Sequence, residues 1–98
     1  MELKEFGIYT SKNTVEIIIK INKDEVIVFE YPVCMFHIMS NFEITRQLLT
    51  MPHLGCGFIR DEKWEIEHLN DLDFAFLGQI QDKFLIKELQ KIIKEKHI

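Results

Sequence analysis

The first third of the chain alternates between apolar and polar residues with the period of two that is typical of β-strands. The clearest run is residues 15–21, whose one face carries only β-branched residues: Val15, Ile17, Ile19 and Ile21. Residues 3–10 and 25–31 alternate in the same way, and short polar turns separate the three runs. The pattern therefore predicts an antiparallel three-stranded meander, which Pro32 ends.

The segment from residue 33 to residue 51 is compatible with one long helix or with a shorter one. Apolar residues at helical spacing run through the whole segment. Residues 40–43, however, have the sequence of a capping box, which starts a helix later. We expect a helix that covers at least residues 41–50 and stops before Pro52.

The last part of the chain combines a second hairpin with a closing helix. Residues 58–60 and 64–69 predict two strands that turn at residues 61–63. Residues 70–79 fit either a short strand or one or two helical turns. Asp82 is a candidate N-cap for an amphipathic helix. The apolar stripe of that helix consists of Leu85, Ile86, Leu89, Ile92 and Ile93.

These elements predict a single α+β domain over residues 1–98. Its antiparallel sheet combines the three-stranded N-terminal meander with the second hairpin and packs against two helices, in the order βββ-α-ββ-α. We expect the helices to cover one face of the sheet. With 98 residues and a hydrophobic share of 47%, the chain has enough apolar surface for a core without disulfides or metal ions.

Composition narrows the cellular setting and the kind of partner. The formal net charge of −4 disfavours direct attraction to nucleic acid or to anionic lipid and favours a neutral or basic partner. No apolar run precedes Ile17, which excludes an ordinary signal peptide. The longest apolar stretch, from Tyr31 to Met39, is too short to span a bilayer. With two cysteines at most one disulfide is possible, so we expect free thiols and a cytoplasmic location.

Charge is divided between two segments. Residues 61–73 contain six carboxylates around Trp64, and the five lysines between residues 83 and 96 fall on the closing helix, where they are typical of a solvated face. Crowded carboxylates repel one another unless water or a partner compensates them. We interpret residues 61–73 as a docking surface for a basic protein, with an acidic surface kept for solubility as the alternative. The expected contacts are Asp61, Glu62, Trp64, Glu65, Glu67, Asp71 and Asp73. The aromatic residue that such an interface needs comes from Tyr9, Tyr31, Trp64 or Phe74.

Two cysteine–histidine pairs have the spacing of zinc ligands. They are Cys34 with His37, and His53 with Cys56. The first pair lies in an apolar stretch where buried thiols are common, so a core cysteine beside an ordinary histidine is the favoured interpretation. We therefore expect no metal and no cofactor. Cys56 lies in a glycine-flanked loop, but no spacing assigns it a base, and no nucleotide-binding or hydrolase motif is present. The sequence predicts a protein that is not an enzyme.

The function that agrees with these features is a small cytoplasmic inhibitor of the immunity or antitoxin type. It would neutralise a cognate toxin, most readily a nuclease, whose basic cleft binds phosphates and attracts acidic surfaces. A phage or mobile-element antagonist of nucleic-acid machinery is one alternative. A structural adaptor or homodimeric interaction module, paired through a free edge of the meander at residues 3–31, is another. The sequence does not decide between monomer and homodimer, and it does not identify the partner.

Overall fold

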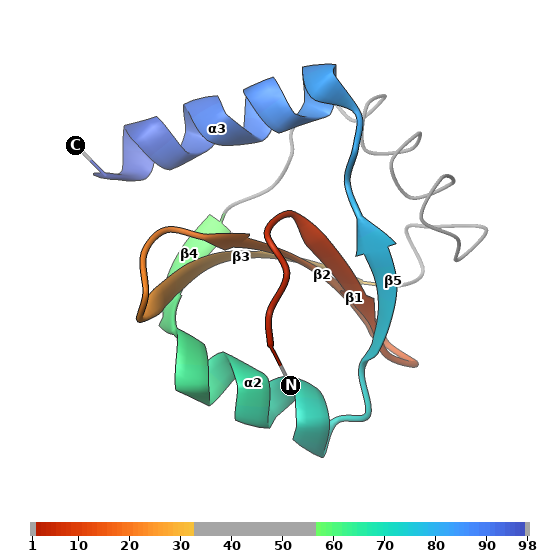
Figure 1. The fold of residues 1–98 in the computed structure, drawn as a ribbon. Coiled ribbons are helices and arrows are strands. Elements are labelled where there is room, and N and C mark those ends of the chain that lie inside the picture. Colours follow the sequence, from red (N-terminus) through yellow and green to blue (C-terminus); the bar gives the residue numbers. More distant parts are fainter. Residues whose placement is uncertain (1, 33–56, 98) are drawn as a thin grey trace.

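The computed structural model describes residues 2–32 and 57–97, except for the side chains of residues 92, 93 and 95–97. In this part of the chain a five-stranded antiparallel sheet lies between two helices (Figure 1). The elements in chain order are β1 (Gly7–Thr10), β2 (Thr14–Lys20), β3 (Glu25–Pro32), β4 (Gly57–Asp61), α2 (Glu62–Asp71), β5 (Ala75–Gln79) and α3 (Lys83–His97). The strands lie side by side in the order β4-β3-β2-β1-β5. The predicted α+β class is confirmed, and the helix expected at residues 41–50 lies outside the described residues.

The N-terminal meander forms as the alternating pattern predicts. β2 pairs with β1 on one side and with β3 on the other, and Ile17 lies opposite Phe29. The tip between β2 and β3 is held by Asn22, whose side-chain oxygen accepts hydrogen bonds from the backbone nitrogens of Asp24 and Glu25. This is the local bonding that makes asparagine favourable in turns.

The two remaining strands extend the sheet at its opposite edges. β4 pairs with β3, and β5 pairs with β1, so both edges of the meander are covered. The expectation of a free meander edge is therefore wrong, and β4 and β5 form the sheet edges instead. Residues 75–79, which fit either a strand or a helical turn by sequence, form a strand because β1 provides a pairing partner.

The predicted second hairpin is also wrong, because its second strand is the helix α2. Asp61 is the N-cap, and its carboxylate accepts a hydrogen bond of 3.1 Å from the backbone nitrogen of Trp64. Apolar and acidic residues alternate over residues 64–69, which imitates a strand, but Ile66 is the single β-branched residue there. The helix-favouring glutamates and leucine decide the local structure once the cap is in place.

The α3 side of the sheet has a core built from apolar side chains. The N-cap prediction for Asp82 is confirmed, since its carboxylate accepts a hydrogen bond of 2.9 Å from the backbone nitrogen of Leu85. Leu85 and Leu89 are fully buried in the cluster that covers this face. The sheet residues of the cluster include Ile8, Val15, Ile17, Ile19, Ile27, Phe29 and Tyr31. Burying such side chains provides the main driving force for this layer.

The opposite face of the sheet is covered by α2. Leu69 and Phe74 pack against Ile18, Val26 and Val28. The helices thus lie on two faces of the sheet, so the expectation that they cover one face is wrong (Figure 1). The central strands β1, β2 and β3 are consequently buried on both sides. Neither α2 nor α3, the two helices in the described ranges, combines the length and apolarity that crossing a bilayer requires.

Candidate functional site

The acidic segment that was predicted to bind a partner lies on α2 and at its two ends. Asp61, Glu67, Asp71 and Asp73 are exposed to solvent. The remaining acidic members differ, because Glu62 is half-buried and pairs with Lys20 at 3.4 Å, and Glu65 is fully buried. Glu65 therefore cannot serve as a surface contact, contrary to the expectation from sequence. A strand would have placed Glu65 and Glu67 on one face, whereas the helix turns Glu65 toward the sheet.

Trp64 is the aromatic residue that this surface presents. Its exposed fraction is 50%, whereas Tyr9, Tyr31 and Phe74 are buried in the core and are not available to a partner. Phe58, on the adjacent strand β4, is also partly exposed. We refer to the exposed residues Asp61, Trp64, Glu67, Asp71 and Asp73 as the α2 surface.

A buried charged cluster lies directly beneath α2. Glu16 projects from the centre of the sheet, and Glu65 faces it from the helix; both side chains are fully buried. Arg60, at the end of β4, lies between them. Its Nη1 is 2.6 Å from Glu65 Oε1 and 3.6 Å from Glu16 Oε1. One guanidinium therefore compensates two buried carboxyl groups, which burial alone would make very unfavourable.

Two further residues, His68 and Glu30, form ion-pair or hydrogen-bond contacts with these groups. His68, one turn along α2 from Glu65, places Nε2 3.0 Å from Glu16 Oε2. Glu30, on the neighbouring strand β3, is exposed and pairs with Arg60 Nη2 at 3.4 Å. We call Glu16, Arg60, Glu65 and His68 the acid cluster. It links β2, β4 and α2 at a single point.

The acid cluster holds protons more tightly than exposed glutamates would. Burial raises the pKa of Glu65 to about 8; its hydrogen bond to Glu16 adds to the rise, and the bond to Arg60 opposes it. Burial also raises the pKa of Glu16, although the hydrogen bond from Glu65 and the charge of Arg60 lower it. Within the described residues, Glu16 Oε1 and Glu65 Oε2 have no other hydrogen-bond partner. A proton shared between the two carboxyl groups removes part of this deficit.

Stacked rings connect the acid cluster to the α2 surface. The Trp64 and His68 rings are 5.0 Å apart and only 14° from parallel. The Arg60 guanidinium carbon lies 4.7 Å from the centre of the Trp64 ring and 4.3 Å from that of Phe58. Such cation–π contacts contribute about 0.5–1 kcal/mol at exposed sites. The exposed tryptophan is thus in contact with two members of the buried cluster.

Glu16, Glu65 and His68 are also a plausible set of metal ligands by type. One donor atom from each residue lies within 4.8 Å of the others. The cation that contacts both carboxylates here is, however, the guanidinium of Arg60. A divalent ion beside Arg60 would give the cluster an excess of positive charge, so the residues do not fit a metal well. The sequence-predicted zinc candidates Cys34, His37, His53 and Cys56 lie outside the described residues.

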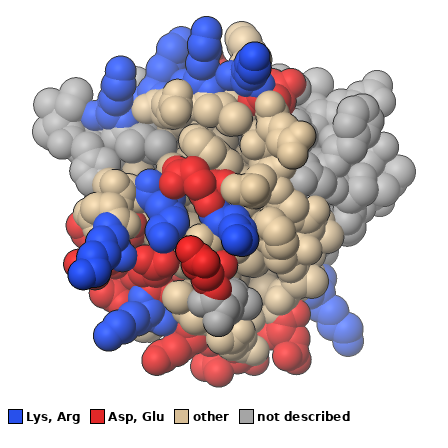
Figure 2. Space-filling model, in the orientation of Figure 1, with Lys and Arg blue, Asp and Glu red and all other residues tan. Residues whose placement is uncertain are grey.

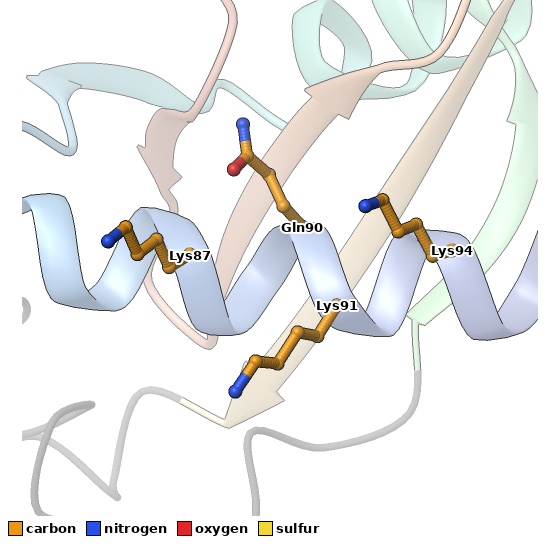
Figure 3. Close-up of a pocket in the computed structure, with 4 residues that line it drawn as sticks. All are labelled: Lys87, Gln90, Lys91 and Lys94. Carbon is orange, nitrogen blue, oxygen red and sulfur yellow. The ribbon is translucent and has the colours of Figure 1, made fainter.

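The opposite side of the molecule is basic. Lys83, Lys87, Lys91 and Lys94 of α3 are all exposed. Figure 2 shows blue along the α3 side and red along the α2 side, with the two colours mixed between them. Lys87, Lys91 and Lys94 line a shallow hollow together with Gln90 (Figure 3). Lys91 is also paired with Glu88 at 3.3 Å. No aromatic residue among the described lining residues offers a surface for base stacking, which agrees with a solvated helix face.

Sequence reasoning overlooked the acid cluster. Glu16, Arg60 and His68 lay in three separate predicted strands, at residues 15–21, 58–60 and 64–69, and no motif linked them. One signal was available: Glu16 lies between Val15 and Ile17, in a run with five consecutive buried residues. Arg60, Glu65 and His68 follow Glu16 by 44 to 52 residues in the chain, so their contact with it depends on the sheet order.

Comparison with known proteins adds no relative. The chain matches no protein-family model, and searches of curated proteins and of solved structures find no similar chain.

Proposed function

We propose that this chain is a small acidic binding protein that docks its α2 surface onto a basic protein and thereby inhibits it. The partner class that best fits is an enzyme with a cationic substrate cleft, such as a toxic nuclease. Association of this kind is accelerated by opposite charges, and its affinity is concentrated in a few buried aromatic or arginine contacts.

The observation that carries the proposal is the position of Trp64 among uncompensated carboxylates. Four exposed acids and the single exposed lysine Lys63 lie between residues 61 and 73. No Lys or Arg of the described residues is within ion-pair distance of Glu67, Asp71 or Asp73. A tryptophan with half of its surface exposed leaves a large apolar area in water, which a partner can bury.

Trp64 is also preorganised for binding. The helix N-cap fixes its backbone, and the ring of His68 with the guanidinium of Arg60 restricts its side chain. A rigid aromatic side chain loses little conformational entropy on binding, so more of its burial appears as affinity. The lysines of α3, on the opposite side, orient the acidic side toward a cationic partner.

The experiment is affinity capture with three matched baits. The wild type is compared with the double variant Glu67→Lys/Asp71→Lys and with the control Lys87→Glu, which changes charge on α3. A partner of the proposed kind is retained by the wild type and the control and is lost by the double variant. Its activity is then measured with and without the wild-type protein, and inhibition is the expected result.

Two quantitative measurements follow on the purified pair. Raising the salt concentration from about 50 mM to about 500 mM should weaken binding at least about tenfold, since exposed charges are screened. Trp64→Ala should weaken it by about 2 kcal/mol or more, as expected for a central aromatic contact. Binding without inhibition would favour the adaptor class, and binding that is insensitive to both salt and Trp64→Ala would refute docking through the α2 surface.

A further inference from the structure

The acid cluster contains one more buried negative charge than its permanent cation can compensate. Glu16 and Glu65 contribute two carboxylates when both are ionised, and Arg60 contributes one positive charge. The exposed Glu30 shares the same guanidinium and adds no compensation. A net charge left between a sheet and a helix is very costly to desolvate, so the cluster requires one additional positive charge.

A proton satisfies this requirement better than a metal ion. One proton makes the cluster neutral when His68 is neutral, whereas a divalent ion would leave it with a net positive charge beside Arg60. The two fully buried oxygens without a hydrogen-bond partner among the described residues, Glu16 Oε1 and Glu65 Oε2, belong to the two carboxyl groups that would share this proton. One oxygen of each carboxyl group lies within 4.8 Å of the other, which is close enough for the two groups to interact strongly.

The charge state of the cluster is transmitted directly to the α2 surface. Glu65 follows Trp64 directly on α2, and the His68 ring stacks on the Trp64 ring. Arg60 contacts both Glu65 and the Trp64 ring. The contacts that hold this part of α2 on the sheet also include the apolar residue Leu69 and the half-buried pair of Lys20 with Glu62. Loss of the proton would place two like charges face to face between α2 and β2.

We propose that the Glu16–Glu65 pair holds a shared proton that fixes α2 on the sheet, and that release of this proton displaces Trp64 and weakens docking. The last step rests on the function proposed above, whereas the conformational step does not. The ionisable neighbours of the pair are Arg60 of β4 and His68 of α2, together with Tyr9 of β1 and Glu30 of β3, which lie opposite Glu16 on the adjacent strands. Tyr9 accepts a hydrogen bond from the backbone nitrogen of Lys4.

The test uses the emission of Trp64, the single tryptophan of the chain, in the absence of any partner. The pH is raised through the Glu65 pKa of about 8 while fluorescence and far-ultraviolet circular dichroism are recorded. The wild type should show a red shift of the emission maximum as Trp64 loses its contacts, with the sheet retained. Glu65→Gln, an uncharged mimic of the protonated acid, should lose this transition. Glu67→Gln, the matched exposed control two residues away, should retain it.

Further variants keep the interpretation open to refutation. Glu16→Gln should behave as Glu65→Gln does, and it replaces that variant if Glu65→Gln does not fold. His68→Gln should retain the alkaline transition. If His68→Gln loses the transition while Glu16→Gln and Glu65→Gln keep it, the proton belongs to His68 and the assignment is overturned. An emission maximum that does not change with pH in the wild type would also overturn it.

The last experiment tests whether the acid cluster binds a divalent cation in place of the proton. Zn²⁺ or Mn²⁺ added to the wild type at neutral pH should leave the melting temperature unchanged. A rise that Glu65→Gln abolishes and Glu67→Gln retains would identify a metal site and would overturn the proton assignment. Because these measurements need no partner, their failure leaves the proposed docking function untouched, and a failed capture experiment leaves the proton assignment untouched.

Discussion

The two faces of the sheet are covered by helices of similar geometry but different chemistry. On the α3 side, Leu85 and Leu89 complete a cluster of buried hydrophobic residues, to which no buried charged residue of the described part of the chain belongs. On the α2 side, an apolar layer that includes Leu69 and Phe74 surrounds the buried carboxyl groups of Glu16 and Glu65. The sheet therefore has one face that serves stability alone and one that also confines charge.

This difference indicates where function lies. Replacing a buried ion pair by apolar residues is often neutral or stabilising, so stability alone does not account for the acid cluster. The cluster instead lies beneath the half-exposed Trp64 of the α2 surface and contacts it through Arg60 and His68. We infer that the charged face positions the docking residue, whereas the apolar face holds the fold. The following variants examine this division, beginning with the largest expected effect.

Arg60→Met should destabilise the protein most, by about 3–5 kcal/mol at neutral pH, because it leaves two buried carboxyl groups without their cation. Methionine keeps an unbranched apolar chain near Phe58 and Trp64, so the loss reports mainly on charge. Urea unfolding measures it. The free energy of unfolding of Arg60→Lys should lie between those of the wild type and Arg60→Met, because lysine keeps the positive charge but not the planar guanidinium group. A loss below about 1 kcal/mol for Arg60→Met would contradict the buried position of the cluster.

Leu89→Ala should destabilise the α3 side by about 2–5 kcal/mol through a cavity in the apolar layer. Its effect should be independent of pH, unlike that of Arg60→Met, because no ionisable group belongs to this cluster except the tyrosine Tyr31. The exposed neighbour Gln90→Ala is the control and should change the free energy of unfolding by less than about 0.5 kcal/mol. Equal losses for the two variants would show that α3 does not pack as described.

The wild type should become less stable as the pH rises from 4.5, the ordinary glutamate value, toward about 8. In that range the folded protein retains a proton at Glu65 that the unfolded chain has released, so unfolding becomes easier with increasing pH. One proton gives a slope of at most about 1.4 kcal/mol per pH unit, and the slope vanishes above the folded pKa. Comparing urea unfolding of the wild type and Glu65→Gln isolates this contribution. Identical slopes would argue against proton uptake at Glu65.

Asp61→Ala should cost about 1 kcal/mol, as the loss of a helix N-cap usually does. Asp82→Ala removes the corresponding cap of α3 and should cost about the same. The fluorescence of Trp64 distinguishes the two variants. Asp61→Ala should also alter this emission, because Asp61 caps α2 close to Trp64, whereas Asp82→Ala should not. A change of the same size in both would contradict a local effect on α2.

Trp64→Ala should have the smallest effect on stability, about 0.5–1 kcal/mol, because half of the side chain is already exposed and mainly its stacking contacts are lost. Its effect on binding should be larger than its effect on folding. Thermal unfolding beside a binding measurement separates the two quantities. A loss of stability above about 3 kcal/mol would identify Trp64 as a core residue and remove it as a docking contact.

Local sequence patterns determined much of the secondary structure of this protein. Alternation with many β-branched residues predicted the three meander strands, and the Asp82 cap with its apolar stripe predicted the closing helix, because both signals depend on neighbours close in the chain. The same reasoning named Trp64 as one of four candidate aromatic contacts, and the structure shows that it is the exposed one of the four. It misassigned residues 64–69 because a short alternation of apolar and acidic residues fits a strand by period and a helix by propensity.

The tertiary structure decided the features that depend on contacts between segments far apart in the chain. The sheet order puts β4 beside β3 and directs α2 back across the face opposite α3, which buries Glu16 and brings Arg60, Glu65 and His68 to it. A glutamate on a strand is compatible with water on one face or with a helix above it, and no local preference distinguishes the two. The free energy that selects between them is the burial of α2 itself, a property of the assembled layers and not of any segment.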